Sequence, residues 1–200
     1  MSNRCYLTCT DSTQIYPAAG DLPDFDPEVH TVLSSAGCVP LLWLCLFSER
    51  DLQGRKIAIE AEEPIQAEAP IALRSSALAL LEGRRDFLCE LFADNGGLTH
   101  HLDMFSSRLS AYPGSYLSIE YDEIGWLYAA PEEFAALVRL TLAQLDAGSP
   151  SAKEGLVELS TLMIERRFVT LDEAPNADQE DAWNYFRILG EGYIRNAPWD

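Results

Sequence analysis

The sequence predicts an α+β fold in which a small, mainly antiparallel sheet is covered by six or seven helices, with more helix than strand. The strongest strand signal lies in residues 116–128, YLSIEYDEIGWLY, where apolar and polar residues alternate as in a half-buried strand. The expected inward positions are Leu117, Ile119 and Tyr121, and the expected outward positions are Ser118, Glu120 and Asp122. Two further strands are predicted near 4–10 and 55–61, and most other apolar residues recur at helical spacing. A length of 200 residues suits one compact domain, 1–200.

The first third of the chain begins with the strand at 4–10, RCYLTCT, followed by a loop over 11–26 in which Pro, Gly and Asp dominate. A helix is predicted from the N-cap Asp26 to Gly37, because Pro27 suits a first turn and the following apolar residues have helical spacing. The run VPLLWLCLF at 39–47 is apolar all round and predicts a buried helix. Alternation predicts the strand at 55–61, and 62–69 is interpreted as a linker.

Five more helices are expected on either side of the strand that begins at Tyr116. The first runs from Pro70 to Leu91, with Gly83 as a point where it kinks or splits. The others are expected at 98–109, at 131–145, across Leu156, Leu159 and Met163 to Arg166–Arg167, and across Trp183, Phe186, Leu189 and Tyr193. The strand at 116 is expected to reach residue 124, and a short strand is predicted at 168–171.

The four tryptophans are candidates for either core or interface positions, because an exposed aromatic beside acids is typical of a protein interface. Trp43 and Trp183 are expected in the core, and Leu127 is expected to pack under the helix that begins at Pro131. Trp126 is either a core residue or an interface residue, and so is Trp199.

The cysteines and the hydropathy pattern bear on the compartment. The five cysteines are an odd number, and three of them lie in apolar segments, which predicts reduced thiols rather than a disulfide framework. No apolar run approaches the roughly 20 residues of a membrane span, and the first residues lack the apolar core of a signal peptide. We therefore expect a cytoplasmic protein with no membrane contact.

The formal net charge of −18 is the most informative number in the composition. Several windows contain acids and no bases, and three of them supply candidate partner-binding residues: Asp21, Asp24 and Asp26, then Glu120, Asp122 and Glu123, then Asp178, Glu180 and Asp181. Such a field repels nucleic acid and anionic membranes and attracts basic partners. The alternative interpretation is that the charge only keeps the protein soluble.

A search for catalytic and metal-binding patterns gives mostly negative results. The sequence has no glycine-rich phosphate loop, CxxC pair, HExxH or GxSxG motif, so we assign no catalytic, cofactor-binding or metal-binding residue. His100, His101 and Asp103 form one candidate metal cluster, with His30 as a distant third imidazole, but adjacent histidines point in different directions on a helix. Glu120 with Asp122 or Glu123 is a candidate acid–base pair, although the alternation argues against the burial that such chemistry needs.

Three segments carry a resemblance to a known group of proteins. They are the opening SNRCYLT, the segment PLLWLCLFSERDL at 40–52, and the segment YLSIEYDEIGWL. Together they resemble a poorly characterised bacterial family that begins with an NRSYLY-like strand and carries a PLLWLALF-like helix, with Cys5 here in place of a serine. Members of that family are similar to immunity proteins encoded beside secreted polymorphic toxins. The resemblance implies an antitoxin role and transfers no functional residues.

The sequence therefore leads to a hypothesis and an alternative. The hypothesis is a cytoplasmic immunity protein, not an enzyme, that binds and blocks a basic toxin domain without any cofactor. Trp126 and the acids of the three windows named above are its candidate contacts. The alternative is a small metal- or carboxylate-dependent enzyme, or an accessory subunit of one. The oligomeric state is left open.

Overall fold

The computed structural model describes residues 3–11, 31–57, 65–93, 96–170, 173 and 176–190. In these ranges five strands form one antiparallel sheet in the order β2-β1-β5-β4-β3. The strands are β1 (Arg4–Thr10), β2 (Thr31–Ala36), β3 (Leu52–Ile57), β4 (Ile65–Leu73) and β5 (Tyr116–Glu120). The last strand in sequence, β5, therefore occupies the centre of the sheet.

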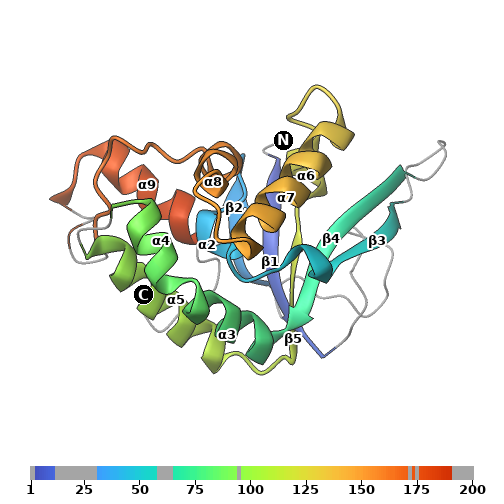
Figure 1. Ribbon diagram of the computed structural model, residues 1–200, viewed down its shortest axis with the longest axis horizontal. Helices are drawn as coiled ribbons and strands as arrows, with labels where there is room; N and C mark the ends of the chain where they lie inside the picture. Colours follow the sequence, from blue (N-terminus) through green and yellow to red (C-terminus); the bar gives the residue numbers. More distant parts are fainter. Residues whose placement is uncertain are drawn as a thin grey trace.

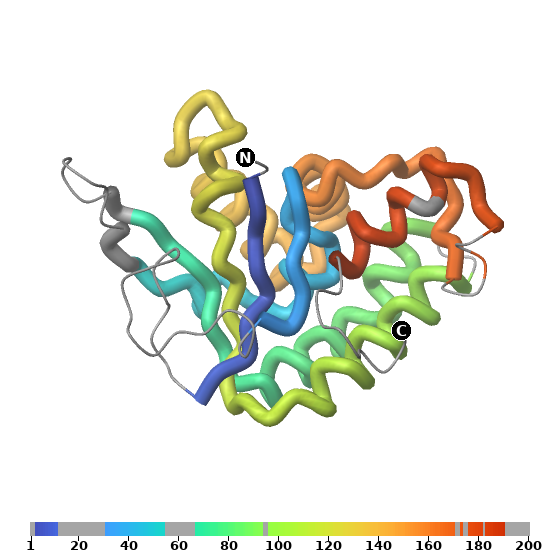
Figure 2. Tube along the Cα trace, turned by 180° about the vertical axis from the view of Figure 1, so that it is seen from behind, coloured from blue at the N-terminus to red at the C-terminus, as the bar shows by residue number. Residues whose placement is uncertain are grey.

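Helices account for more residues than strands, so the prediction of a helix-rich α+β fold is confirmed. They are α2 (Leu41–Leu44), α3 (Arg74–Gly83), α4 (Arg85–Leu91), α5 (Gly97–Ala111), α6 (Asp122–Gly125), α7 (Pro131–Asp146), α8 (Ala152–Ser160) and α9 (Gln179–Leu189), with a short 3₁₀ turn at Glu49–Asp51. Figure 1 shows α3, α4, α5 and α9 to the left of the strands, and Figure 2 shows the same arrangement from behind. Among the described residues, no helix has the length and apolar character that crossing a membrane requires.

The apolar run at 39–47 forms the centre of the core. Every residue from Val39 to Phe47 is buried, as the sequence predicted, although only α2 within it is helical. The indole Nε1 of Trp43 donates a hydrogen bond to the carbonyl oxygen of Leu189 at 2.9 Å. The first third of the chain is thereby tied to the end of α9.

The side chains of β5 and the two residues after it are buried as predicted on the inward face, but not exposed as predicted on the outward face. Leu117, Ile119 and Tyr121 are buried as predicted. Ser118 and Asp122 are buried as well, which corrects the expectation that both point outward. The hydroxyl of Ser118 lies 2.7 Å from that of Thr8, its register partner on β1, and the chain turns into α6 at Asp122 instead of continuing as a strand to 124.

Two strands lie where the sequence predicted other structure. The helix expected up to Gly37 is wrong over 31–36, which form β2, and residues 27–30 lie outside the described residues. The linker expected at 62–69 and the helix expected from Pro70 are wrong over 65–73, which form β4. Long-range pairing decides both, because β2 pairs with β1 and β4 pairs with β3 over 65–70 and with β5 over 71–73. The strand predicted at 55–61 begins earlier, at Leu52, and residues 58–61 lie outside the described ranges.

The later helices are close to the predictions, and α3 and α4 divide at Gly83 and Arg84 as the glycine suggested. The helix expected to reach Arg167 ends at Ser160, because Thr161 adopts a left-handed conformation with φ of 54°. Residues 168–170 are not a strand. Trp43 is in the core as predicted, whereas Trp183 and Leu127 are exposed and those two predictions are wrong. Tyr193 and Trp199 lie outside the described residues.

Candidate functional site

The candidate site is the turn between β5 and α7, which we call the α6–α7 corner and define by Glu123, Trp126, Leu127, Glu132 and Glu133. The chain leaves the sheet at Glu120, makes the single turn of α6 and enters α7 with Pro131 in its first turn. Trp126 is 60% exposed and Leu127 is 55% exposed, which is unusual for large apolar side chains. Trp126, left open by the sequence, is therefore a surface residue.

Packing beneath the corner holds these two side chains outward. The ring of Phe134 on α7 contacts Tyr121 edge-on, with ring centroids 5.1 Å apart, and Tyr128, with centroids 5.2 Å apart. A Cβ atom at Gly125 would lie 3.3 Å from Cδ1 of Phe134, so the backbone of α6 sits directly on that ring. Because the inward residues of the turn are fixed on both sides, Trp126 and Leu127 between them are positioned before any partner arrives.

The acids around the corner occupy different environments. Glu132 and Glu133 are exposed in the first turn of α7, where the helix dipole favours negative charge. Glu123 is half-buried, and its Oε2 accepts a hydrogen bond from the backbone N–H of Arg4 at 2.9 Å. In the described part of the chain, none of these three carboxylates forms an ion pair with a lysine or arginine. The charges of Glu132 and Glu133 therefore face solvent, with no ion-pair partner among the described residues.

The other two acids predicted beside this corner are less accessible. Glu120 is half-buried, and its Oε1 accepts a hydrogen bond from the backbone N–H of Asp122 at 3.3 Å. Asp122 itself is buried. The structure thus exposes Trp126, leaves Glu120 and Glu123 half-buried and buries Asp122.

The acids near the start of α9, which have no base close to them in sequence, lie beside two arginines in the folded structure. Arg166 forms ion pairs with Asp178 and Glu180, and Arg167 approaches Asp181 at 3.9 Å. Asp178 also caps α9 by accepting hydrogen bonds from the backbone N–H groups of Glu180 and Asp181. These acids stabilise local structure, and two bases from the preceding segment offset their charge. The third window, Asp21, Asp24 and Asp26, lies outside the described residues.

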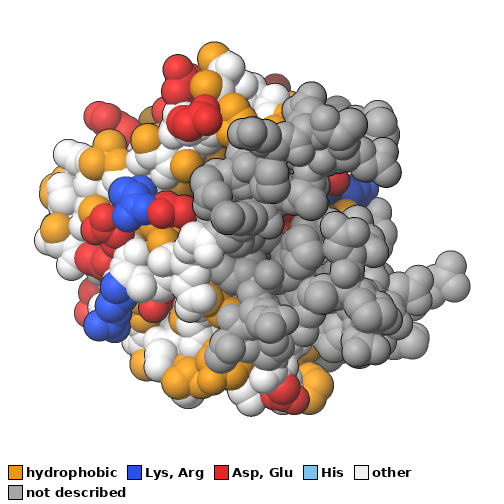
Figure 3. Space-filling view, turned by 90° about the vertical axis from the view of Figure 1, so that its right-hand side faces the viewer, with side chains coloured by type: hydrophobic (Ala, Val, Ile, Leu, Met, Phe, Trp, Pro, Cys, Tyr) orange, Lys and Arg blue, Asp and Glu red, His pale blue; other side chains and the backbone are white. Residues whose placement is uncertain are grey.

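Figure 3 shows how the remaining charge is distributed on one face. Acidic and hydrophobic side chains lie side by side at its top, the end of the molecule where α6 lies in Figure 1. Lower on the same face, blue side chains lie beside red ones. Among the described residues, Arg139 pairs with both Glu49 and Glu68.

The candidate metal cluster is not assembled. The rings of His100 and His101 lie at an interplanar angle of 63° with centroids 6.0 Å apart, and His101 packs edge-on against Tyr185 inside the protein. Asp103 pairs instead with Arg85 at 2.8 Å. No three metal-ligating side chains gather within the described ranges, and His30 lies outside them.

The cysteines show no sign of activation. Cys5 and Cys9 are buried, and burial raises the pKa of both thiols, for Cys9 against a smaller lowering by the guanidinium of Arg74. A thiol with a raised pKa is a poor nucleophile at neutral pH. All five cysteines are free.

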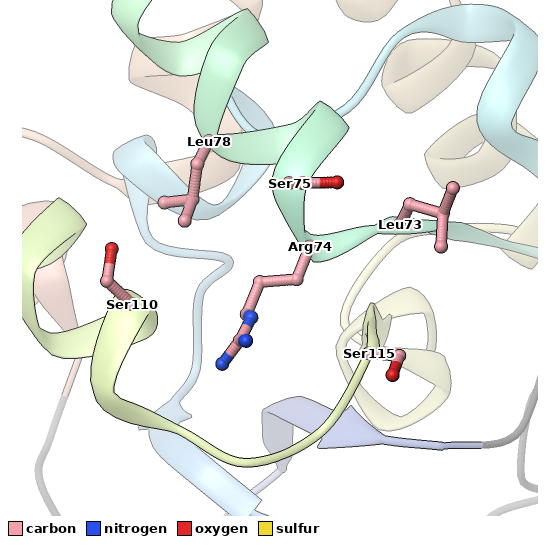
Figure 4. Close-up of a pocket in the computed structure, with 6 residues that line it drawn as sticks. All are labelled: Leu73, Arg74, Ser75, Leu78, Ser110 and Ser115. Atoms are coloured by element: carbon pink, nitrogen blue, oxygen red, sulfur yellow. The ribbon is translucent and has the colours of Figure 1, made fainter.

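Sequence reasoning missed a cavity of about 390 Å³ at the start of α3, shown in Figure 4. Its walls come from the end of β4, from α3, from the end of α5 and from the loop before β5: Leu73, Arg74, Ser75, Leu78, Ser110 and Ser115. The cluster of Arg74 with two following serines was visible in the sequence, but the contributions of Ser110 and Ser115 depend on tertiary folding. This cavity and the α6–α7 corner lie at opposite ends of β5.

Comparison of the chain with models of known protein families, with curated proteins and with solved structures gave no significant match.

Proposed function

We propose that this chain is a cytoplasmic immunity protein that binds a basic toxin domain and blocks it, with the α6–α7 corner at the centre of the contact. One observation carries the proposal: an exposed tryptophan and leucine stand on a rigid turn beside three carboxylates that have no basic partner among the described residues. The resemblance of three segments to a family of immunity-like proteins supports the same role.

The chemistry of the corner suits a basic protein partner. Tryptophan is among the residues that contribute most to binding energy when a partner buries it, and its indole N–H can donate a hydrogen bond at the interface. Carboxylates around such an apolar centre attract lysine and arginine and accelerate encounter, as does the net charge of −18. The fixed backbone of the corner lowers the ordering entropy lost on binding. Binding of this kind needs no cofactor.

The test is to produce the chain together with the protein encoded next to it and to measure both complex formation and inhibition of that protein. A double reversal of corner charge, Glu132→Lys with Glu133→Lys, is expected to slow association and to flatten its dependence on salt. Asp86→Lys with Glu90→Lys is the matched control. It changes two exposed acids of α4 and alters the net charge by the same amount.

The comparison between these variants separates the corner from the overall charge. Equal slowing by both pairs would mean that net charge alone steers association, and the corner would be eliminated as the contact. A neighbouring gene product that neither binds the chain nor loses activity in its presence would overturn the proposed function itself.

A further inference from the structure

We propose that the cavity at the start of α3 binds the carboxylate of a small ligand with a short apolar body, held by Arg74. This site is separate from the α6–α7 corner and does not depend on the proposed antitoxin role. It rests on the cavity itself, on the lack of a carboxylate partner for Arg74 among the described residues, and on the two leucines that also line the cavity.

Arg74 is the cation that the cavity presents. Its side chain runs from α3 towards the loop between Ser110 and Ser115, as Figure 4 shows. The guanidinium makes one long hydrogen bond, from Nη1 to the carbonyl oxygen of Leu109 at 3.4 Å, and no ion pair with any carboxylate of the described residues. In a chain with 32 acids, an arginine that lines a cavity without a carboxylate partner has its charge available for a ligand.

Two of the three serine hydroxyls that line the cavity already donate their protons to other protein groups. Ser110 donates its hydroxyl proton to the carbonyl oxygen of Ser106 at 2.7 Å, and Ser115 donates its own to Oδ1 of Asp11 at 2.8 Å. Ser75 also lines the cavity, but Figure 4 shows its hydroxyl pointing away from the guanidinium, so Arg74 is the donor that an anion would meet. The first turn of α3 is held in place because the backbone N–H of Arg74 donates to the carbonyl oxygen of Ser115 at 2.8 Å.

Two leucines add apolar surface to the cavity. Leu73 is 48% exposed and Leu78 is half-buried, and both line the same opening as Arg74. A volume of about 390 Å³ lies near the lower end of the range typical of small-ligand pockets. In Figure 4 the two leucines lie on opposite sides of Arg74, with Leu78 on the side of the guanidinium. A guanidinium with leucine surface next to it fits an amphiphile that has an acid group and a few carbons.

The charge of the surroundings selects a monoanion over a dianion. Asp11 lies against Ser115 at the rim, and the net charge of the chain is −18, so each added negative charge on a ligand meets repulsion. Inorganic phosphate offers no surface to Leu73 and Leu78. A carboxylate with an apolar body is therefore the better match, and it can come from a free short-chain acid or from the C-terminus of a peptide that ends in an apolar residue.

The experiment is a set of titrations of the full chain followed by NMR amide shifts. The ligands are isovalerate, N-acetyl-leucine, N-acetyl-leucine amide and inorganic phosphate. We expect both carboxylates to cause saturable shifts at Ser75 and Ser115 with dissociation constants on the order of millimolar, and the amide and phosphate to bind at least about tenfold more weakly. Tighter binding of N-acetyl-leucine than of isovalerate identifies a peptide C-terminus as the source, and the reverse order identifies a free acid.

Variants then assign the binding to Arg74. Arg74→Gln is expected to weaken isovalerate binding by about tenfold, whereas Arg139→Gln, which changes an arginine outside the cavity, is expected to leave it unchanged. If Arg74→Gln does not fold, the proposal is still tested by comparing the binding of N-acetyl-leucine with that of N-acetyl-leucine amide to the unaltered chain. The proposal is overturned if neither carboxylate causes a saturable shift, if the amide binds as tightly as the acid, or if a folded Arg74→Gln variant binds isovalerate as the unaltered chain does.

Discussion

Arg84 and Asp146 form an ion pair, 2.5 Å between Nη2 and Oδ1, that joins the α3–α4 junction to the end of α7. The Arg84 side chain is only 6% exposed, and its Nη1 also donates to the carbonyl oxygens of Cys45 and Phe47 at 3.0 and 2.7 Å. The other carboxylate oxygen of Asp146 accepts from the hydroxyl of Ser48 at 2.6 Å. One buried guanidinium therefore fixes three segments that are distant in sequence.

Removal of this guanidinium is predicted to be costly. Arg84→Met leaves two buried carbonyl groups and a carboxylate without their donor, and we expect the free energy of unfolding to fall by about 3–5 kcal/mol. Arg139→Met is the control, since that arginine is exposed although it pairs with two glutamates, and its loss should cost no more than about 1 kcal/mol. Urea denaturation measures both. If Arg84→Met lowered the free energy of unfolding by no more than Arg139→Met does, the buried Arg84 network would not be a special source of stability.

The central strand provides a second prediction. Ile119 is fully buried in β5, so Ile119→Ala should lower the free energy of unfolding by about 2–5 kcal/mol. Glu120→Ala, one position along, removes a half-buried polar side chain at the last residue of the strand and should cost less than about 1.5 kcal/mol. The opposite order, measured by thermal or urea unfolding, would contradict the register of β5.

The exposed tryptophans allow a matched test of the α6–α7 corner. Trp126→Ala and Trp183→Ala each remove a side chain that is about half exposed or more, and both variants should keep nearly the full stability of the chain. Only Trp126→Ala is expected to increase the rate at which the co-encoded protein dissociates, with a loss of about 2 kcal/mol or more in binding free energy. Surface plasmon resonance gives the rates. An equal effect from Trp183→Ala would place the contact elsewhere.

Alkaline pH should destabilise the fold through a buried thiol. Burial raises the pKa of Cys45 from 9.0 to about 12, against a smaller lowering by Arg84. Above pH 9 the unfolded chain loses this proton while the folded chain keeps it, so the stabilising contribution is complete below pH 9 and is lost towards pH 12. The difference corresponds to about 4 kcal/mol.

Cys45→Ala isolates that contribution from the others. Burial also raises the pKa of Tyr128 and of Tyr185, so part of the alkaline decline should remain in the variant. The measurement is the slope of the unfolding free energy against pH above 9. A slope that does not change on Cys45→Ala would rule out the thiol as its source.

Helix packing provides a fifth prediction. A Cβ atom at Gly155 on α8 would fall on Oγ1 of Thr141 and lie 3.1 Å from its Cβ, so Gly155→Ala should cost about 1–3 kcal/mol. The cost should shrink in a Thr141→Ala background, where the hydroxyl is gone. Gly83→Ala meets no atom within 4 Å and should be neutral or stabilising by up to about 1 kcal/mol. Thermal unfolding of the double-mutant cycle checks the coupling, and additive effects would argue against close contact of α7 and α8 at this point.

Sequence patterns predicted the elements whose stability is mostly local. Helix α7 has a proline in its first turn and acids beside it, and its predicted range of 131–145 differs from Pro131–Asp146 by one residue. The strands β2 and β4 could not be found in this way, because each pairs with a strand that is distant in sequence, β2 with β1 and β4 with β5. Trp183 and Leu127 were mispredicted for a similar reason. Their positions in the sequence fitted packed side chains, but tertiary packing leaves both exposed.

The candidate site was anticipated only in part. Glu123 and Trp126 were chosen from the sequence, and Trp126 is exposed while Glu123 is half-buried, but the burial of Asp122 depends on the turn into α6. The acids near α9 appeared isolated because no base lies close in that stretch of sequence, yet Arg166 and Arg167 reach them across a loop. A cavity such as the one at Arg74 is visible only after three separate segments meet.

The central place of β5 has a consequence for the order in which the protein is made. The β1–β2 and β3–β4 pairs can each form as soon as their residues are available. Among the described strands, β5 alone joins them, since it pairs with β1 on one side and β4 on the other. A ribosome must therefore release residues up to Glu120 before the two halves of the sheet can combine. Until then the nascent chain carries two separate hairpins whose inner edges are unpaired, and such edges are where aggregation begins.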